Sequence, residues 1–192
     1  KALTDLHIVL SSAPRDVVSK VNELIPNACP SYSSREIYEY IDLSRTVLLD
    51  PYAEESLTEN DVRSYDFFII GGIIDRLFPR PYASYMLYKM LSLDIARKGI
   101  RLRGSAVGVP SEINKIIDIV LTVRLEGIEL EKAIIANMGV DDKIARILHE
   151  IEKLKKSREK LSVDYVRELM AVYELDDKYL PRILSRISLG GI

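Results

Sequence analysis

Two short apolar runs constrain the fold of this chain more than any other feature. They lie in the segments RTVLLD (residues 45–50) and DFFIIGG (residues 66–72), and neither run alternates polar with apolar residues. A strand with one solvated face alternates, whereas an uninterrupted apolar strand is typical of a parallel sheet covered on both faces. The two runs therefore predict a parallel α/β sheet.

The neighbouring segments supply the strands and helices that such a sheet requires. Further strands are predicted in LHIVLSS (residues 6–12), IRLRGSAVGVP (residues 100–110) and IVLTV (residues 119–123). Helices are predicted over residues 13–25, over residues 111–118, and over residues 81–98 with Gly99 as the C-terminal cap. The polar segment 51–65 is expected to be a loop with a short helix.

After Gly127 the pattern becomes helical throughout. The spacing of apolar residues predicts a helix over residues 128–138 that ends at Gly139, and three more over residues 141–158, 163–173 and 177–187. Ser162 is suited to cap the second of these three. We therefore expect an α/β domain over residues 1–139, followed by a helical C-terminal extension over residues 140–192.

Composition excludes several classes of site and location. The 192 residues include one cysteine, Cys29, and two histidines, His7 and His149, so neither an internal disulfide nor a zinc site of ordinary ligand spacing can form. The longest apolar run is too short to cross a bilayer, and a cytoplasmic protein without metal is expected. A net charge of -2 means that any RNA binding must come from a local patch. The chain begins at Lys1 rather than at Met, which suggests a fragment.

The glycine pair that follows the second apolar run is the first candidate site. Paired glycines weaken a strand, and an unpartnered buried carboxylate such as Asp75 is costly to desolvate. A ligand close to the backbone of Gly71 and Gly72 would explain both features, although a tightly packed turn is the simpler explanation of an isolated IIGGIID segment. Ligands of parallel sheets bind beyond the carboxyl ends of strands. Two further predicted strand ends qualify, at residues 108–110 and 121–123.

Familiar nucleotide and hydrolase motifs are missing from the sequence. The first strand is followed by neither a G-x-G-x-x-G nor a G-x-x-x-x-G-K-[ST] motif, and the two histidines are expected to be structural or surface residues. Basic residues concentrate between residues 76 and 103, where Asp94 is the only acidic residue. A solvated helix face is the usual explanation for such a run, and phosphate contacts are the alternative.

The blocks DFFIIGGIIDR, GVP and VLTV, in this order and spacing, resemble the archaeal branch of the SPOUT-type tRNA (purine-9, N1)-methyltransferases. The resemblance covers residues 5–138. It implies a parallel sheet with a C-terminal trefoil knot, and S-adenosylmethionine held by backbone groups of three loops. The matching residues are Ile70, Gly71, Gly72 and Ile73; Gly108, Val109 and Pro110; and Leu121, Thr122 and Val123.

The resemblance also implies a substrate and a reaction. Asp75 matches the family carboxylate near the target base, and the reaction is methylation of N1 of the purine at position 9 of tRNA, with adenine favoured over guanine. The residues expected to contact RNA are Arg76, Arg80, Lys89, Arg101 and Arg103. A monomer is expected, since this family is typically monomeric.

Two departures and two rival functions remain open at this stage. Arg124-Leu125 replaces the Asn-Gln pair that many members carry after the third block, and the basic N-terminal region of the family does not precede Lys1. Weak tRNA affinity is therefore expected. The rivals are another SPOUT methyltransferase with a different RNA target, and a non-enzymatic RNA-binding α/β module.

Overall fold

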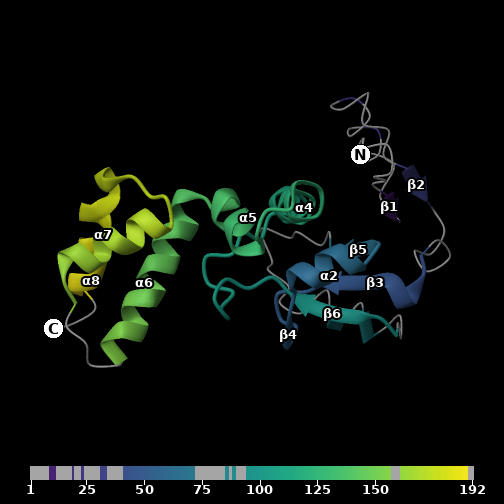
Figure 1. The fold of residues 1–192 in the computed structure, drawn as a ribbon, viewed down its shortest axis with the longest axis horizontal. Coiled ribbons are helices and arrows are strands. Elements are labelled where there is room, and N and C mark those ends of the chain that lie inside the picture. Colours follow the sequence, from purple (N-terminus) through teal and green to yellow (C-terminus); the bar gives the residue numbers. More distant parts are fainter. Residues whose placement is uncertain are drawn as a thin grey trace.

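The structure is a computed structural model and describes residues 9–11, 19, 23, 31–33, 41–71, 85–86, 88–89, 94–156 and 161–189. Its main sheet has four parallel strands in the order β4-β6-β3-β5 (Figure 1). Their bounds are β3 (Thr46–Leu49), β4 (Glu55–Ser56), β5 (Phe67–Ile70) and β6 (Ala96–Gly99). The parallel α/β sheet and the strands in both apolar runs are thereby confirmed.

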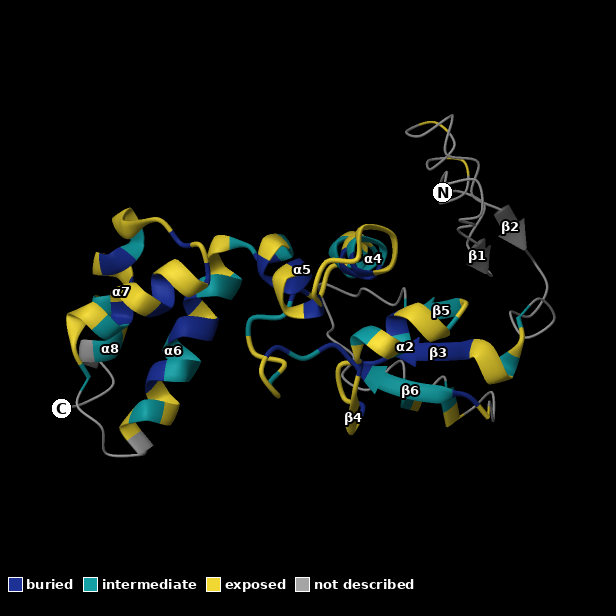
Figure 2. Ribbon diagram, in the orientation of Figure 1, coloured by how far each residue is buried: buried dark blue, intermediate teal, exposed yellow. Residues whose placement is uncertain are grey.

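The burial of β3 explains its uninterrupted apolar sequence. This strand pairs with β5 on one side and with β6 on the other, and all four of its residues are buried (Figure 2). A strand enclosed in this way gains by carrying apolar side chains on both of its faces. Strand β5 is half-buried throughout.

A second, two-stranded parallel sheet is formed by β1 (Val9–Ser11) and β2 (Ser31–Ser33). Strand β1 confirms the strand predicted in LHIVLSS. Ser19 and Glu23 are helical, in agreement with the helix predicted between the two strands. Strand β2 was not predicted, because its sequence SYS has no apolar run.

A short helix and one turn of 3-10 helix flank the central strands. The turn η3 (Leu43–Arg45) leads into β3, and α2 (Glu59–Ser64) lies in the polar segment before β5. Thr58 and Asp61 form a capping box: the Asp61 N–H donates to the Thr58 Oγ1 at 3.1 Å, and the Thr58 N–H donates to the Asp61 Oδ2 at 2.8 Å. The helix therefore starts where its first free N–H groups are satisfied.

The prediction of a continuous helix over residues 81–98 is wrong at its C-terminal end. Tyr85, Met86, Tyr88 and Lys89 are helical, but residues 96–99 form strand β6. Pairing with β3 and β4 on both sides overrides the local helical pattern. Gly99 is not a helix cap. A Cβ at this position would lie 3.1 Å from the Asp50 carbonyl oxygen, so the glycine allows the backbone after β3 to approach β6 closely.

The strand predicted over residues 100–110 is also absent. Leu102 and Ser105 pair across a tight turn, with N···O distances of 2.8 and 3.0 Å. Arg103 and Gly104, which form the turn, have φ angles of 47° and 76°. Two consecutive residues in the left-handed region reverse the chain immediately, and a continuous strand cannot form.

The strand predicted over residues 119–123 is helical instead. Helix α4 (Ile113–Leu121) continues directly into the π-helical segment η4 (Thr122–Glu126), which ends at Gly127 with a φ of 72°. Buried Ile119, Val120 and Val123 recur at helical spacing and lie on the face that meets the core. Their β-branched side chains suggested a strand, but the period of burial is that of a helix.

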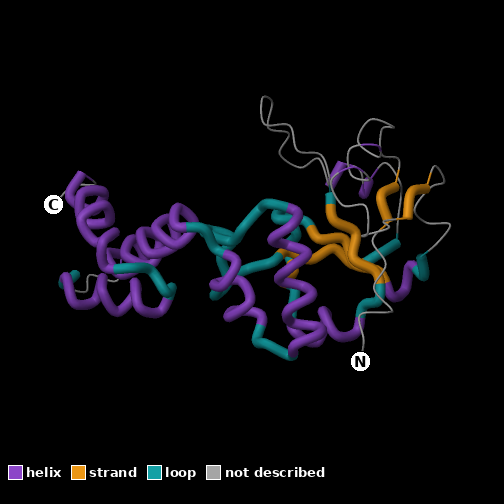
Figure 3. The backbone as a smooth tube through the Cα atoms, turned by 90° about the horizontal axis from the view of Figure 1, so that it is seen from above, coloured by secondary structure: helices purple, strands orange, loops and turns teal. Residues whose placement is uncertain are grey.

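The helical C-terminal part is confirmed. It consists of α5 (Leu130–Asn137), α6 (Val140–Lys156), α7 (Val163–Val172), the 3-10 turn η5 (Asp177–Tyr179) and α8 (Leu180–Leu189). Ser162 caps α7 as predicted, since its side chain accepts from the Tyr165 N–H at 3.1 Å. Helices α6, α7 and α8 gather at one end of the molecule and the strands at the other (Figures 1 and 3).

One hydrophobic cluster connects the two parts. It extends from Val47 on β3 to Ile183 on α8, and both residues are completely buried. The helical extension therefore shares its core with the sheet instead of folding around a separate one. Among the described helices, none combines the length and apolar character needed to cross a bilayer.

Candidate functional site

Three neighbouring strands bring their carboxyl ends to one edge of the sheet. Leu49 is in register with Ile70 on one side and with Lys98 on the other. The residues that follow these three in sequence are Asp50, Gly71 and Gly99. The Asp50 N–H donates to the Lys98 carbonyl at 3.0 Å. This edge is where ligands of parallel sheets bind.

The predicted cofactor residues Ile70 and Gly71 lie at this edge, and both are partly exposed. Gly71 adds no side chain beside the end of β3, so main-chain atoms are left accessible there. This geometry fits a cofactor held by backbone groups. Gly72, Ile73, Asp75, Arg76 and Arg80 lie outside the described residues.

Asp50 is a buried carboxylate at the centre of the same edge, and it is not among the predicted site residues. Its side chain is 1% exposed; Oδ1 accepts from the Tyr52 N–H at 3.0 Å, and Oδ2 lies 3.4 Å from the Arg97 guanidinium. Arg97 in turn stacks over Tyr85 and Tyr88, at 4.6 and 5.9 Å from the ring centroids. The only sequence signal was a carboxylate that ends an apolar run.

The tyrosine contacts bear on the basic run between residues 76 and 103. Tyr85 and Tyr88 are partly buried and pack on Arg97. Lys89 is exposed, with its Nζ 5.6 Å from the Tyr85 centroid. Of the three predicted RNA contacts that the structure describes, Lys89, Arg101 and Arg103, Lys89 presents its charge to solvent with least restraint.

The predicted loop of Gly108, Val109 and Pro110 packs against the helical extension. Gly108 has a φ of 79°, and a Cβ there would lie 2.7 Å from the Asp142 carbonyl oxygen and 2.8 Å from the Arg146 Cβ. Pro110 is buried. The glycine is therefore required for the contact with α6 on this side of the loop.

The third predicted loop, Leu121, Thr122 and Val123, is not a loop. The Thr122 N–H already donates to the Asp118 and Ile119 carbonyls, and Val123 is completely buried. This N–H is occupied within the helix, so the expectation of an open backbone loop at this segment is wrong. Ile70 and Val109 pack against the same hydrophobic cluster that contains Val123, so one core borders all three segments.

Arg124, one of the two departures from the family pattern, has a clear structural role. Its guanidinium donates to the carbonyls of Val62, at 2.9 Å, and of Tyr65, and lies 3.3 Å from the Asp66 carboxylate. These groups end α2 and precede β5. Arg124 therefore links η4 to the start of β5, the strand that leads to Gly71.

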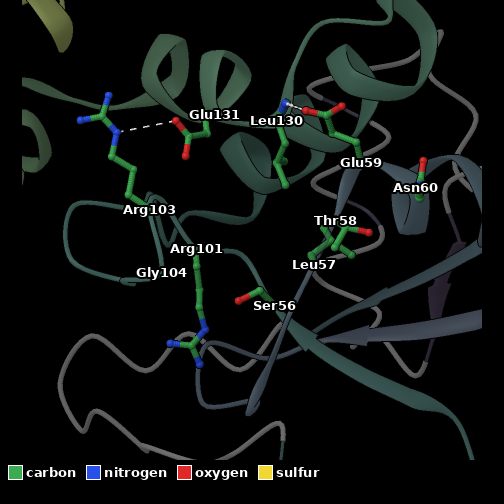
Figure 4. Close-up of a pocket in the computed structure, with 10 residues that line it drawn as sticks. All are labelled: Ser56, Leu57, Thr58, Glu59, Asn60, Arg101, Arg103, Gly104, Leu130 and Glu131. Atoms are coloured by element: carbon green, nitrogen blue, oxygen red, sulfur yellow. Dashed lines mark hydrogen bonds and ion pairs between the residues drawn. The ribbon is translucent and has the colours of Figure 1, made fainter.

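An open hollow of about 390 Å³ lies beyond the ends of β4 and β6, and Arg101 and Arg103 line it (Figure 4). Its other lining residues are Ser56, Leu57, Thr58, Glu59, Asn60, Gly104, Leu130 and Glu131. Arg103 reaches towards Glu131, 3.7 Å away, while Arg101 points to the opposite side, where it donates to the Ala53 carbonyl. The two guanidinium groups diverge, so the hollow does not concentrate positive charge.

Ionisable groups beside β6 are perturbed by specific contacts. Burial raises the pKa of Asp61, but hydrogen bonds from Thr58 and the Lys98 ammonium, 3.1 Å away, outweigh it and hold that pKa below its usual value. The pKa of Lys98 is raised: burial lowers it, and the pairing with Asp61 and Glu55 more than compensates. These groups fasten α2 to β6 and are structural. Within the described residues, no three potential metal ligands lie together.

Comparisons with known proteins point to methyltransferases. The SFM1-like family model, described as protein arginine N-methyltransferase SFM1-like, matches residues 1–93. The tRNA (adenine(9)-N1)-methyltransferase of Sulfolobus acidocaldarius is 34% identical over 146 residues, which are 76% of this chain and 48% of that protein. The tRNA (guanine(9)-/adenine(9)-N1)-methyltransferase of Thermococcus kodakarensis is 33% identical over 141 residues, 72% of this chain and 36% of that protein.

A solved structure supports the same relationship. The crystal structure of Sulfolobus acidocaldarius Trm10 in complex with S-adenosylhomocysteine matches 82% of this chain and 48% of its own, with a TM-score of 0.63 and 30% identity. The chain thus spans about half the length of the first of these relatives. Sequence identity and fold point to the same proteins, and the chain belongs to the Trm10-type family of tRNA position-9 N1-methyltransferases.

Proposed function

We propose that this chain is the S-adenosylmethionine-dependent methyltransferase domain of an enzyme that methylates N1 of the purine at position 9 of tRNA, with adenine favoured over guanine. The observation that carries the proposal is the 34% identity to an adenine(9)-N1 enzyme along most of the chain. The related structure with S-adenosylhomocysteine supports the choice of cofactor. A monomer in the cytoplasm, with the trefoil knot of the family, completes the proposal.

The described residues suit a methyl donor at the carboxyl edge of the sheet. Ile70 and Gly71 would offer main-chain groups where β5 ends, and Gly108, Val109 and Pro110 would form a second wall. Gly72 and Ile73, outside the described residues, are proposed to belong to the same site. Leu121, Thr122 and Val123 would contribute packing from the end of α4, since this segment is helical. S-adenosylmethionine supplies a methyl group on a sulfonium, which an N1 lone pair can attack.

Asp75 would act on the target base, and its task depends on the purine. Guanine N1 carries a proton that must leave, so a carboxylate there would serve as general base. Adenine N1 already offers a lone pair, so Asp75 would only orient the base and stabilise the developing positive charge.

The purine must leave the stack of the tRNA core to reach the methyl group. Arg76, Arg80, Lys89 and Arg103 would hold the RNA backbone nearby, through phosphate contacts that fix register without reading sequence. Arg101 contributes less to this set, because its guanidinium is partly buried and donates to the Ala53 carbonyl.

The direct test is nucleoside mass spectrometry. A tRNA transcript with A9 and a matched transcript with G9 are incubated with the protein and S-adenosylmethionine, then digested and analysed. N1-methyladenosine from the A9 transcript, abolished when A9 is replaced by a pyrimidine, is the expected product. Methylation at another position would favour a different RNA target, and no methylation together with no S-adenosylhomocysteine binding would favour a non-enzymatic module.

A second candidate function is protein arginine methylation. The observation in its favour is the match of residues 1–93 to the SFM1-like model, described as protein arginine N-methyltransferase. The two functions differ in acceptor but share the donor. Incubation of a protein extract with a labelled methyl donor separates them: label in hydrolysed arginine supports the second function, and label confined to RNA supports the first.

A further inference from the structure

Arg146 on α6 is the largest completely buried side chain among the described residues. Its guanidinium has three partners: Nε donates to the Tyr173 hydroxyl at 3.2 Å, Nη1 to the Val107 carbonyl at 3.4 Å, and Nη2 to the Glu150 carboxylate. A buried cation is stable only when it is paired and hydrogen-bonded. Two of these partners belong to the helical extension, and the third belongs to the loop that leads to Gly108.

The contact between the loop and the extension is close along several residues. A Cβ on Gly108 would overlap with α6 at the Asp142 carbonyl and the Arg146 Cβ. The Arg103 guanidinium lies 5.7 Å from the centroid of the Tyr173 ring, which extends the contact to the turn before the loop. Two of the three partners of Arg146, Tyr173 and Val107, therefore lie within this same interface.

The loop that holds Val107 forms two local hydrogen bonds. Val107 is 38% exposed, and its N–H donates to the Ser105 hydroxyl at 3.2 Å, while the Val109 N–H donates to the Ala106 carbonyl at 3.1 Å. These are local bonds within a short stretch, and they do not tie the loop to the sheet. Val109 packs against the hydrophobic cluster and Pro110 is buried, so the core anchors the end of the loop, while the contact with α6 positions Val107 and Gly108.

We propose that Arg146 is a positioning residue for the methyl-donor site, and that the helical extension serves to hold residues 107–110 in place. This inference rests on the proposed function, in which Gly108, Val109 and Pro110 form one wall of the cofactor site. Arg146 does not touch the cofactor: its guanidinium holds the Val107 carbonyl, and the loop holds the cofactor. Removal of the guanidinium should therefore weaken cofactor binding without changing any group that contacts it.

Three variants of the chain separate positioning from general stability. Arg146→Met keeps the aliphatic stem and removes the guanidinium, and Tyr173→Phe removes only the hydroxyl that accepts from Nε. Ile183→Ala is the matched control, because Ile183 is completely buried in α8 and the substitution destabilises the extension without removing a bond to the loop. Each variant is measured at a temperature where circular dichroism shows it folded.

The first readout is the Kd for S-adenosylhomocysteine by calorimetry. Arg146→Met is expected to raise the Kd about tenfold, since small displacements of binding groups are costly. Tyr173→Phe should raise it by a smaller factor, and Ile183→Ala should leave it unchanged. The KM for tRNA should stay the same in Arg146→Met while the KM for the methyl donor rises. An unchanged Kd in Arg146→Met, or an equal rise in Ile183→Ala, overturns the proposal.

The second readout does not depend on the enzyme's activity. Amide hydrogen exchange of Val107 and Val109 in native buffer should accelerate in Arg146→Met and not in Ile183→Ala. If the unaltered chain fails to bind S-adenosylhomocysteine, the proposed function is wrong. The amide exchange rates of Val107 and Val109 then still test whether Arg146 holds the loop in place. Unaltered exchange rates in both Arg146→Met and Tyr173→Phe would show that Arg146 does not position the loop.

Discussion

Arg124 and Asp66 lie 58 residues apart in sequence, yet the guanidinium of one is 3.3 Å from the carboxylate of the other. The second oxygen of Asp66 is 2.8 Å from Arg45 Nε, so one carboxylate joins η4 to the entrance of β3 as well as to β5. Arg124 also donates to two carbonyls at the end of α2. The Arg124 side chain therefore links η4 to the end of α2 and to the residue directly before β5, the strand that leads to Gly71.

Arg124→Met should destabilise the fold through the loss of these bonds. Two backbone carbonyls and a carboxylate would lose their donor, and we expect the free energy of unfolding to fall by about 1–3 kcal/mol. Urea denaturation followed by circular dichroism measures the change. Arg63→Met is the control, because the ion pair of Arg63 with Glu59, at 3.8 Å, is exposed and worth at most about 0.5 kcal/mol. Equal losses in the two variants would contradict the assigned role.

Gly108→Ala and Gly127→Ala form a matched pair that separates backbone strain from packing. The two glycines have φ angles of 79° and 72°, so each alanine carries a similar conformational penalty of about 1–2 kcal/mol. A Cβ on Gly127 meets nothing within 4 Å, whereas one on Gly108 overlaps with α6. The additional loss in Gly108→Ala should be about 1–3 kcal/mol in thermal or urea unfolding. Similar losses at both positions would mean that α6 moves aside freely.

His149 should make stability depend on pH in the mildly acidic range. Burial lowers the pKa of His149 below its ordinary value of 6.5, and the charges of Lys153 and Arg146 lower it further. Its Nε2 is buried and has no hydrogen-bond partner among the residues that the structure describes. The unfolded chain therefore binds this proton more readily than the folded one, so the stability is complete above pH 6.5 and falls as the pH decreases.

The comparison of the unaltered chain with His149→Phe isolates this effect. The difference in unfolding free energy should be constant above neutral pH and should shift in favour of the variant below pH 6.5, by at most about 1.4 kcal/mol per pH unit. Urea titrations at a series of pH values measure it. Curves that stay parallel down to pH 5 would show that His149 titrates normally in the folded protein.

Asp75→Asn should distinguish the two purine substrates. Because adenine N1 needs no deprotonation, the variant is expected to methylate an A9 transcript only modestly more slowly, whereas methylation of a G9 transcript should lose a factor of about 10²–10⁴ as a general base is removed. Single-turnover rates with each transcript give the comparison. A near-total loss with A9 would refute the positioning role of Asp75 for adenine.

Most of the correctly predicted elements are those whose pattern arises from local sequence. The uninterrupted apolar runs of β3 and β5 required burial on both faces, and the helices α5 to α8 showed apolar spacing of about 3.6 residues, with Ser162 as a local cap. Gly71 follows the carboxyl end of β5, as its place after the apolar run predicts. In each case the information lies within a few residues of the element itself.

The sequence by itself determined a parallel α/β sheet with a helical extension, because amphipathic and apolar periodicities are properties of short segments. Only the tertiary structure decided that ARKG forms a strand, since pairing with two neighbours and the contacts of Lys98 with Glu55 and Asp61 come from distant parts of the chain. It likewise decided that residues 119–123 are helical and that Arg146 is buried against the loop at Val107. Such contacts depend on which segments meet in space, and the pattern of any one segment does not contain that information.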